Sequence, residues 1–328
     1  MKKFLLGIVT IILVSSFLGA FGMVSFAQMP TQLPREETLY VYPAQWGPPT
    51  TFNPLASSPA WPCNRGHDPL IYETLFTYNL LTGKLEPLIG ESYNWHLYNL
   101  TIKLRKGAKW QDGTSLTAKD VVYTFQLGKK YSLYHSSVWD FITDIKAKDD
   151  LTVVITLNKD KPHKARVEAF LNQIFIIPQH IWSKYDTNQK ILQEYADTEP
   201  IGSGPYKLIA YSPEQIVLQR DDSYWGISYY GKPAPKYIVH PIFKSNDAVN
   251  LAFERGEIDC SQTFCPEIWK MWEVKKLPVG TWYKKEPYHM PASIPSLYIN
   301  IHKKPLNNPL LRRALAYAIN YEKIAETA

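Results

Sequence analysis

The sequence has few cysteines and lacks the cysteine pattern of a metal site. Cys63, Cys260 and Cys265 are its only cysteines, and none belongs to a CxxC pair. Three such residues indicate neither a disulfide scaffold nor a typical zinc site. Cys260 and Cys265 are close enough in sequence to form a bridge, and two buried thiols are the alternative. The sequence leaves that choice open.

Motifs of catalysis are missing as well. The eight histidines stand singly, without HExxH spacing, and no GxSxG nucleophile turn occurs, which disfavours a metalloprotease and a serine hydrolase. The glycines at 202 and 204 are not followed by the Lys-Ser/Thr of a phosphate-binding loop, and Pro205 removes one backbone donor. We therefore predict that the protein is not an enzyme and has neither a metal site nor a cofactor.

The sequence also has little excess charge. Its 36 basic and 30 acidic residues give a formal charge of +6 that is spread along the chain. A nucleic-acid-binding domain concentrates positive charge on one face. We therefore expect no nucleic acid among the partners.

Aromatic side chains are what the sequence has in abundance. It contains 22 Tyr, 13 Phe and 10 Trp among 328 residues, a length that suits about two domains. Most of these rings are expected in the core, because aromatic burial dominates packing energetics. Ten tryptophans nevertheless leave some for a ligand-binding surface.

The first 27 residues have the pattern of a secretory signal. Lys2 and Lys3 precede a long uncharged stretch, and a small-x-small sequence at 25–27 predicts cleavage before Gln28. An uncleaved membrane anchor is the alternative, because the apolar stretch is long for a signal. Without a following cysteine, lipid attachment is not expected. The remaining chain is predicted to act outside the cytoplasmic membrane, in the periplasm or at the cell surface.

The strongest local pattern lies between residues 88 and 125. Alternating apolar residues predict a strand at 100–104, and glycines at 107 and 113 suit tight turns. Thr117 and Asp120 have the spacing of a capping box before an apolar helix face. The other elements that the residue pattern predicts are strands at 39–42, 149–157, 206–211 and 216–218 and helices at 70–76 and 248–256.

Several of these segments also carry recognisable motifs. The longest is LRKGAKWQDGTSLTAKDVVYTF at 104–125, and it is joined by DDLTVVITL at 149–157, GSGPY at 202–206 and RGEID at 255–259. In this order they resemble the oligopeptide-type, family 5 extracellular solute-binding proteins of bacterial ABC importers, and the overall look is nearest to members that bind oligosaccharides. By the same resemblance, a strand is expected at 298–301 and a helix at 305–328.

The resemblance implies an α/β fold with two lobes, the type II-like periplasmic-binding-protein fold with an extra small domain in lobe one. We expect lobe one to comprise residues 28–60 and 179–245, its accessory domain 61–178, and lobe two 246–328. Members of the family are usually longer, so we expect a C-terminally truncated chain or a remainder encoded elsewhere. The resemblance also implies a monomer that closes on its ligand and is recognised by an ABC permease in the membrane.

The expected ligand is a small oligomer, either sugar or peptide. Indole faces pack well on pyranose rings, so the tryptophan content favours a cello- or manno-oligosaccharide. An oligopeptide is the alternative, and a secreted hydrolase with two catalytic carboxylates is a distant one. For Trp46, simple packing is an equal alternative to ligand contact. By the resemblance, the residues expected to contact the ligand are Trp46, Ser58, Trp61, Arg65, Tyr134, Trp139, Gln262 and Phe264.

Overall fold

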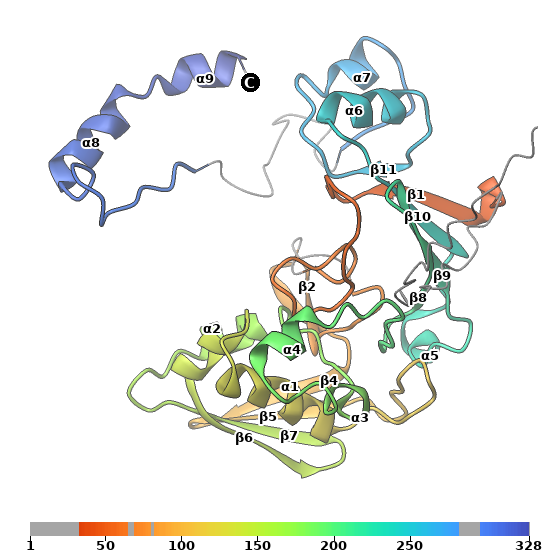
Figure 1. Ribbon diagram of the computed structural model, residues 1–328, viewed down its shortest axis with the longest axis vertical. Coiled ribbons are helices and arrows are strands. Elements are labelled where there is room, and N and C mark those ends of the chain that lie inside the picture. The colour runs from red at the N-terminus through yellow and green to blue at the C-terminus, as the bar shows by residue number, and fades with distance from the viewer. Residues whose placement is uncertain (1–32, 65–68, 80–81, 282–295, 328) are drawn as a thin grey trace, which may run out of the picture.

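A computed structural model describes residues 33–64, 69–79, 82–281 and 296–327, and it contains three β-sheets with surrounding helices (Figure 1). The predicted signal at 1–27 and the candidate Arg65 lie outside the described residues. No helix in the described ranges combines the length and the apolarity needed to cross a bilayer.

The largest sheet has five strands in the order β11-β1-β10-β9-β8. Its strands are β1 (Thr38–Tyr42), β8 (Tyr206–Tyr211), β9 (Gln215–Arg220), β10 (Tyr237–Pro241) and β11 (Cys260–Ser261). The first half of β1 pairs in parallel with β10, and its last two residues, Val41 and Tyr42, pair in parallel with β11. The strands predicted at 39–42, 206–211 and 216–218 are thus confirmed.

The second sheet has four antiparallel strands in the order β4-β5-β7-β6. Its strands are β4 (Gly90–His96), β5 (Asn99–Leu104), β6 (Ile142–Asp149) and β7 (Thr152–Leu157). Leu100, Ile102 and Leu104 alternate into the core as predicted. Helix α1 (Ala118–Lys130) covers this sheet, and the Thr117–Asp120 capping box that starts it is formed. Asp149 ends β6, and residues 150 and 151 form the turn before β7, so the strand predicted at 149–157 begins only at Thr152.

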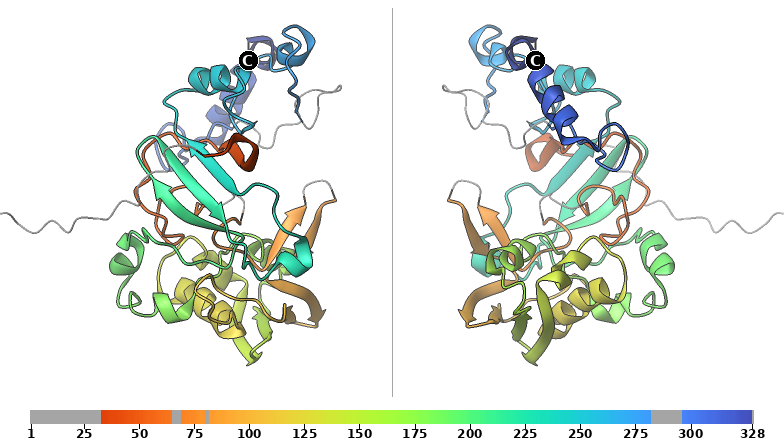
Figure 2. Two further views of the ribbon diagram at one scale, coloured as in Figure 1. Left: turned by 90° about the vertical axis from the view of Figure 1, so that its right-hand side faces the viewer. Right: turned by 90° about the vertical axis from the view of Figure 1, so that its left-hand side faces the viewer.

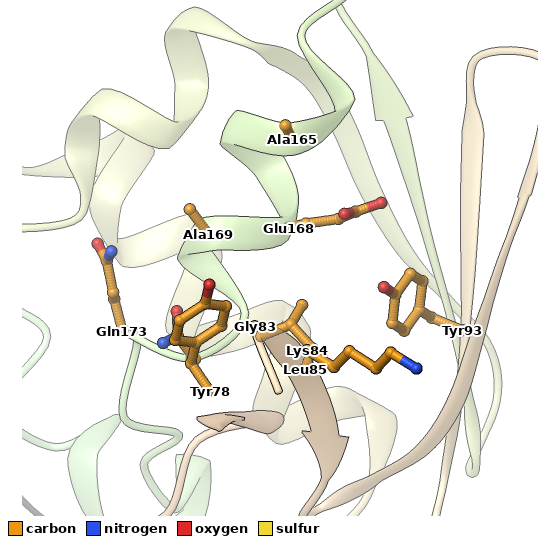
Figure 3. A pocket seen from close by; sticks show the side chains of 10 residues that line it. Tyr78, Gly83, Lys84, Leu85, Tyr93, Ala165, Glu168, Ala169 and Gln173 are labelled. Atoms are coloured by element: carbon orange, nitrogen blue, oxygen red, sulfur yellow. The ribbon is translucent and has the colours of Figure 1, made fainter. Parts of the chain in front are cut away.

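A two-stranded hairpin, β2 (Phe76–Asn79) and β3 (Lys84–Pro87), projects beside the second sheet and faces helix α2 across a cavity (Figure 3). The remaining elements are 3-10 helices η1 (Arg35–Glu37) and η2 (Ser136–Asp140) and helices α2 (Lys164–Phe170), α3 (Gln179–Trp182), α4 (Gln189–Glu194), α5 (Ile227–Tyr230), α6 (Asn246–Glu254), α7 (Lys270–Glu273), α8 (Pro309–Ala318) and α9 (Tyr321–Thr327). Helix α6 stops before Gly256 (φ +73°), as predicted.

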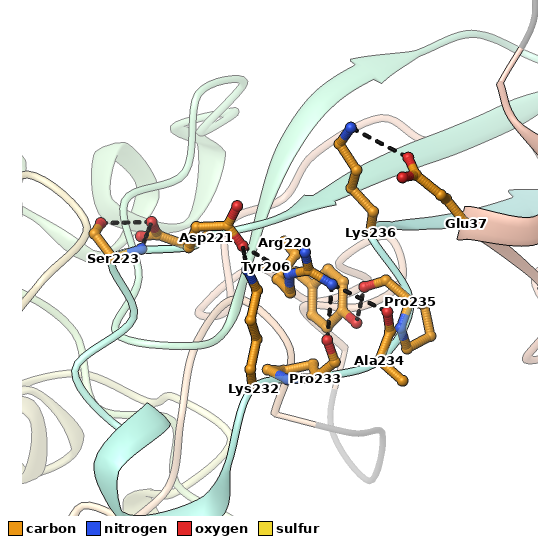
Figure 4. Close-up of polar contacts among 11 residues, drawn as sticks. Glu37, Tyr206, Arg220, Asp221, Ser223, Lys232, Pro233, Ala234, Pro235 and Lys236 are labelled. Carbon is orange, nitrogen blue, oxygen red and sulfur yellow. Dashed lines mark hydrogen bonds and ion pairs between the residues drawn. The ribbon is translucent and has the colours of Figure 1, made fainter.

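Hydrogen bonds hold the loop between β9 and β10 against the large sheet (Figure 4). Arg220 Nη1 donates to the carbonyls of Pro233 (2.8 Å) and Ala234 (3.0 Å), and Tyr206 Oη donates to Pro235 O (2.9 Å). These bonds join the loop to two strands of the large sheet. They hold α5 in place, because α5 lies within this connection.

The prediction of a helix at 70–76 is wrong, because these residues form no helix in the structure. Ile71 O accepts a hydrogen bond from Gly204 N (2.8 Å), and Glu73 O accepts one from Ile176 N (2.9 Å), so this backbone bonds to neighbouring segments. Residues 71–76 are all buried, whereas an amphipathic helix would expose one face. A Cβ at Gly202 would lie 1.8 Å from Ile71 O, so the glycines of GSGPY allow two backbones to approach closely.

The C-terminal predictions are partly wrong. Residues 298–301 do not form a strand, and the Tyr298 side chain is 92% exposed. The helix predicted at 305–328 begins at Pro309, where the side chain of Asn308 accepts from Leu310 N (2.9 Å), and it is interrupted between α8 and α9. Figure 1 shows α8 and α9 apart from α6 and α7.

Two large hydrophobic cores result. One lies between the four-stranded sheet and α1, and the other lies under the large sheet, where Phe52, Trp61, Tyr72 and Trp182 meet Ile216. Figure 2 shows the four-stranded sheet below the five-stranded one. Trp110 and Trp182 are buried in these cores, and Trp225 is half-buried. The residue bounds of the two lobes stay a prediction.

Candidate ligand-binding site

The loop that follows β1 encloses a cavity of about 400 Å³. Trp46 and Ser58, two of the predicted contact residues, line it together and are both exposed. The full lining is Ala44, Gln45, Trp46, Gly47, Pro48, Thr50, Ser58, Pro59, Ala60 and Asn64. The lining is therefore one indole surrounded by small, amide and hydroxyl side chains.

Two amide side chains that the sequence analysis did not single out hold this loop. Gln45 accepts from Trp61 N (2.7 Å) and donates to Gly47 O (2.9 Å). Asn53 is fully buried, and its Nδ2 donates to Leu192 O (2.8 Å), near the end of α4. A buried amide with satisfied hydrogen bonds fixes the backbone around it. The Phe-Asn-Pro run at 52–54 was a signal that could have revealed this role.

A row of rings supports the cavity from within. The Tyr42 ring contacts Trp46 edge-on (centroids 6.1 Å apart) and His240 (5.4 Å), and His240 in turn contacts Trp61 (5.2 Å). Trp46 is 49% exposed, whereas Trp61 is 2% exposed. In this structure the Trp46 indole is therefore available to a ligand, and Trp61 packs in the core beside the loop.

Tyr134 and Trp139 are placed elsewhere. Tyr134 Oη accepts from Phe175 N (3.1 Å), and Trp139 Nε1 donates to Phe125 O (2.8 Å). Both rings are half-buried, and neither lines the cavity at Trp46. The structure does not bring these two residues together with Trp46 and Ser58.

Gln262 and Phe264 follow β11, the parallel neighbour of β1. Gln262 N donates to Tyr42 O (2.8 Å), and Phe264 is 59% exposed. Because β1 and β11 run in parallel, the loops after them leave the sheet at the same edge. Ligands of α/β proteins commonly bind outside the carboxyl ends of strands. The loops carrying Trp46 and Phe264 thus start side by side.

Two buried carboxyl groups lie in the scaffold. Burial raises the pKa of Glu73 to about 8, and Tyr224 Oη (2.5 Å) and Trp225 Nε1 (3.3 Å) donate to its oxygens. Burial likewise raises the pKa of Asp197 to about 6, although Tyr72 Oη donates to it at 2.6 Å. Both carboxyls are enclosed by protein groups, which suits a structural role.

Metal and thiol chemistry has little support in the described part of the chain. There, no group of three or more His, Cys, Asp or Glu side chains is placed to hold a metal ion. Among the described residues, no disulfide joins Cys260 to Cys265, and Cys260 is exposed. Cys63 is fully buried, and burial raises the pKa of its thiol.

The sheet order, the hairpin and the paired loops define the mixed α/β fold of a periplasmic binding protein, and solved structures agree. The chain superimposes with a TM-score of 0.81 on a periplasmic oligopeptide-binding protein of Thermotoga maritima with bound mannohexaose, at 35% identity over 89% of this chain and 53% of that one. The Bacillus subtilis oligopeptide-binding protein AppA with a nonapeptide shares the fold (TM-score 0.58, 23% identity, 72% of this chain and 46% of that one).

The family follows from the sequence comparison. The model "Bacterial extracellular solute-binding proteins, family 5 Middle" matches residues 84–328, so the chain belongs to family 5 of these proteins. It is also 29% identical, over 282 residues, to the probable peptide-binding protein YejA of Agrobacterium fabrum. That match covers 79% of this chain and 44% of YejA, so the chain spans less than half of this relative's length. The predicted family and fold are confirmed.

Proposed function

We propose that this protein is the extracytoplasmic solute-binding component of an ABC importer and that it captures a cello- or manno-type oligosaccharide. The observation that carries the proposal is the half-exposed indole of Trp46 in a cavity of about 400 Å³. The apolar face of a pyranose ring can lie flat on such an indole, whose N–H remains free to meet a polar partner.

The polar part of the same cavity suits hydroxyl groups. Asn64 Oδ1 is buried and accepts no hydrogen bond from the residues that the structure describes. A buried acceptor without a partner is costly, and a ligand donor would relieve that cost. The hydroxyl groups of Thr50 and Ser58 line the same cavity. The mannohexaose bound by the Thermotoga maritima protein, at 35% identity, is of the proposed ligand class.

A peptide ligand is the second candidate. It is favoured by the curated relatives, since YejA is described as a probable peptide-binding protein and further relatives as putative peptide-binding proteins of ABC transporters. Backbone N–H groups of a peptide could donate to Asn64 as sugar hydroxyls could, but a peptide backbone makes no particular use of a flat indole. The Trp46 surface therefore favours the sugar.

The proposed partner is an ABC permease in the membrane, which would receive the ligand from a monomeric binding protein. Gln262 and Phe264 belong to this proposal as contacts from the loop after β11, and so does Arg65. Tyr134 and Trp139 also remain in this proposal as ligand contacts. They could reach the ligand only after a movement of the chain.

Calorimetric titration of the purified chain with mannohexaose, cellohexaose and a nonapeptide tests the proposal. We expect binding of one hexasaccharide and a loss of at least about tenfold in affinity with Trp46→Ala, which corresponds to about 1.4 kcal/mol. Tyr98→Ala is the matched control, because its ring is 40% exposed on the β4–β5 turn. Binding of the peptide alone would replace the sugar by the second candidate, and binding of neither would refute a ligand site here.

A further inference from the structure

A second and larger cavity is lined by none of the loops that carry Trp46 and Phe264. It has a volume of about 550 Å³ and is enclosed by the β2–β3 hairpin, strand β4 and helix α2 (Figure 3). It shares no lining residue with the cavity at Trp46. Its volume falls within the usual range of small-molecule sites, about 300–1,000 Å³.

Two phenol rings and two alanines shape this cavity. Tyr78 of β2 and Tyr93 of β4 stand on its walls, and Ala165 and Ala169 of α2 form the facing side. The alanines are four residues apart and so share one face of the helix. Because they are small, they leave the space that larger side chains would fill. Figure 3 shows the Tyr78 ring directed at this helix face.

One carboxylate is held in place at the cavity wall. Trp95 Nε1 donates to Glu168 Oε1 at 2.6 Å, which fixes the orientation of the acid. Figure 3 shows the carboxylate pointing toward Tyr93. Burial and the nearby Glu168 raise the pKa of Tyr93, so its hydroxyl keeps its proton and can donate. The carboxylate of Glu168 as acceptor and the hydroxyl of Tyr93 as donor are thus already oriented in the absence of a ligand.

The side chains that line the cavity carry one positive and one negative charge. Lys84 extends along the rim below Tyr93, opposite the single carboxylate of Glu168, and the amides of Asn172 and Gln173 are neutral. A cation would be repelled by Lys84, and an anion by Glu168. An uncharged molecule with many hydroxyl groups and one apolar face suits rings, amides and a carboxylate together.

We propose that this cavity binds a neutral pyranose unit of a saccharide, with its apolar face on a tyrosine ring and a pair of hydroxyl groups on Glu168. This site does not depend on the cavity at Trp46 or on the ligand proposed for it. A saccharide bound here would be held by the accessory part of the chain without help from the loops after β1 and β11.

Saturation-transfer difference NMR with cellobiose and mannobiose tests the site in the Trp46→Ala protein, so that the first cavity does not contribute. We expect transfer to one disaccharide, a decrease of at least fivefold with Ala169→Leu, which fills the space, and no change with Arg166→Leu, an exposed position on the same helix that does not line the cavity. Circular dichroism confirms that the variants fold.

Glu168→Gln gives a second readout without any change of volume. We expect about a three- to tenfold weaker affinity for the disaccharide, because a charged acceptor makes a stronger hydrogen bond than an amide oxygen. We also expect the same affinity at low and high NaCl, since the ligand is neutral. Absence of transfer from both disaccharides, equal transfer with Ala169→Leu, or preferential, salt-sensitive binding of tetramethylammonium would each overturn the proposal.

Discussion

Replacement of Glu73 by glutamine is expected to remove most of the pH dependence of this protein's stability. Glu73 is 0% exposed, and its carboxyl group receives hydrogen bonds from Tyr224 and Trp225. Glutamine keeps the shape and one oxygen acceptor. It cannot ionise, so the variant isolates the effect of the buried charge.

The magnitude follows from the pKa of Glu73, which burial raises from 4.5 to about 8. The folded protein therefore holds a proton that the unfolded chain releases. The contribution to stability is full below pH 4.5, and it is lost as the pH rises to about 8. At about 1.4 kcal/mol for each pKa unit, the loss is of the order of 4 kcal/mol between about pH 5 and 9.

Denaturant unfolding at several pH values measures this loss. We expect the free energy of unfolding of Glu73→Gln to exceed that of the unchanged protein by about 4 kcal/mol at about pH 9, with near equality at about pH 5. A smaller slope remains in both proteins, because burial raises the pKa of Asp197 from 3.8 to about 6. Glu91→Gln, at an exposed position of β4, is the control. Parallel curves for the two proteins would refute the buried, protonated Glu73.

Three further substitutions test the local structure by denaturant unfolding. Ala44→Gly should stabilise the fold by about 1 kcal/mol, because Ala44 has φ +67°; destabilisation would contradict that backbone. Thr117→Ala should cost about 1 kcal/mol through loss of the capping box, and Thr117→Ser should restore it. Trp61→Ala should cost about 3–5 kcal/mol because Trp61 is 2% exposed, whereas Trp46→Ala should cost less than about 1; equal costs would refute the assigned burial.

Local patterns predicted the elements that local interactions stabilise. The Thr117–Asp120 capping box and the alternation at 100–104 each depend on residues a few positions apart, and both appear as predicted. The order of several such motifs was also enough to identify the family. Segments whose hydrogen bonds go to distant residues were misread, as at 70–76, where the partners lie near residues 171–176 and 202–206.

The candidate site was only partly predictable for the same reason. Aromatic content drew attention to both Trp46 and Trp61, but nothing in the sequence near them separates the half-exposed ring from the buried one. Trp61 is buried because its ring packs against His240, 179 residues further along the chain, and because it belongs to the core under the large sheet, whose members range from residue 52 to residue 238. The role of Asn53 depends in turn on carbonyls of α4 and the residue after it.

By itself, the sequence determined the family, the capped helix, most of the strands and the absence of common catalytic motifs, because each is carried by residues adjacent or regularly spaced in the chain. Only the tertiary structure decided that Trp46 and Ser58 share a cavity, that Tyr134 and Trp139 lie elsewhere, and that Glu73 is buried. Burial and proximity arise when distant segments pack together. Around Trp46, Tyr134 and Glu73 they leave no periodic pattern in the local sequence.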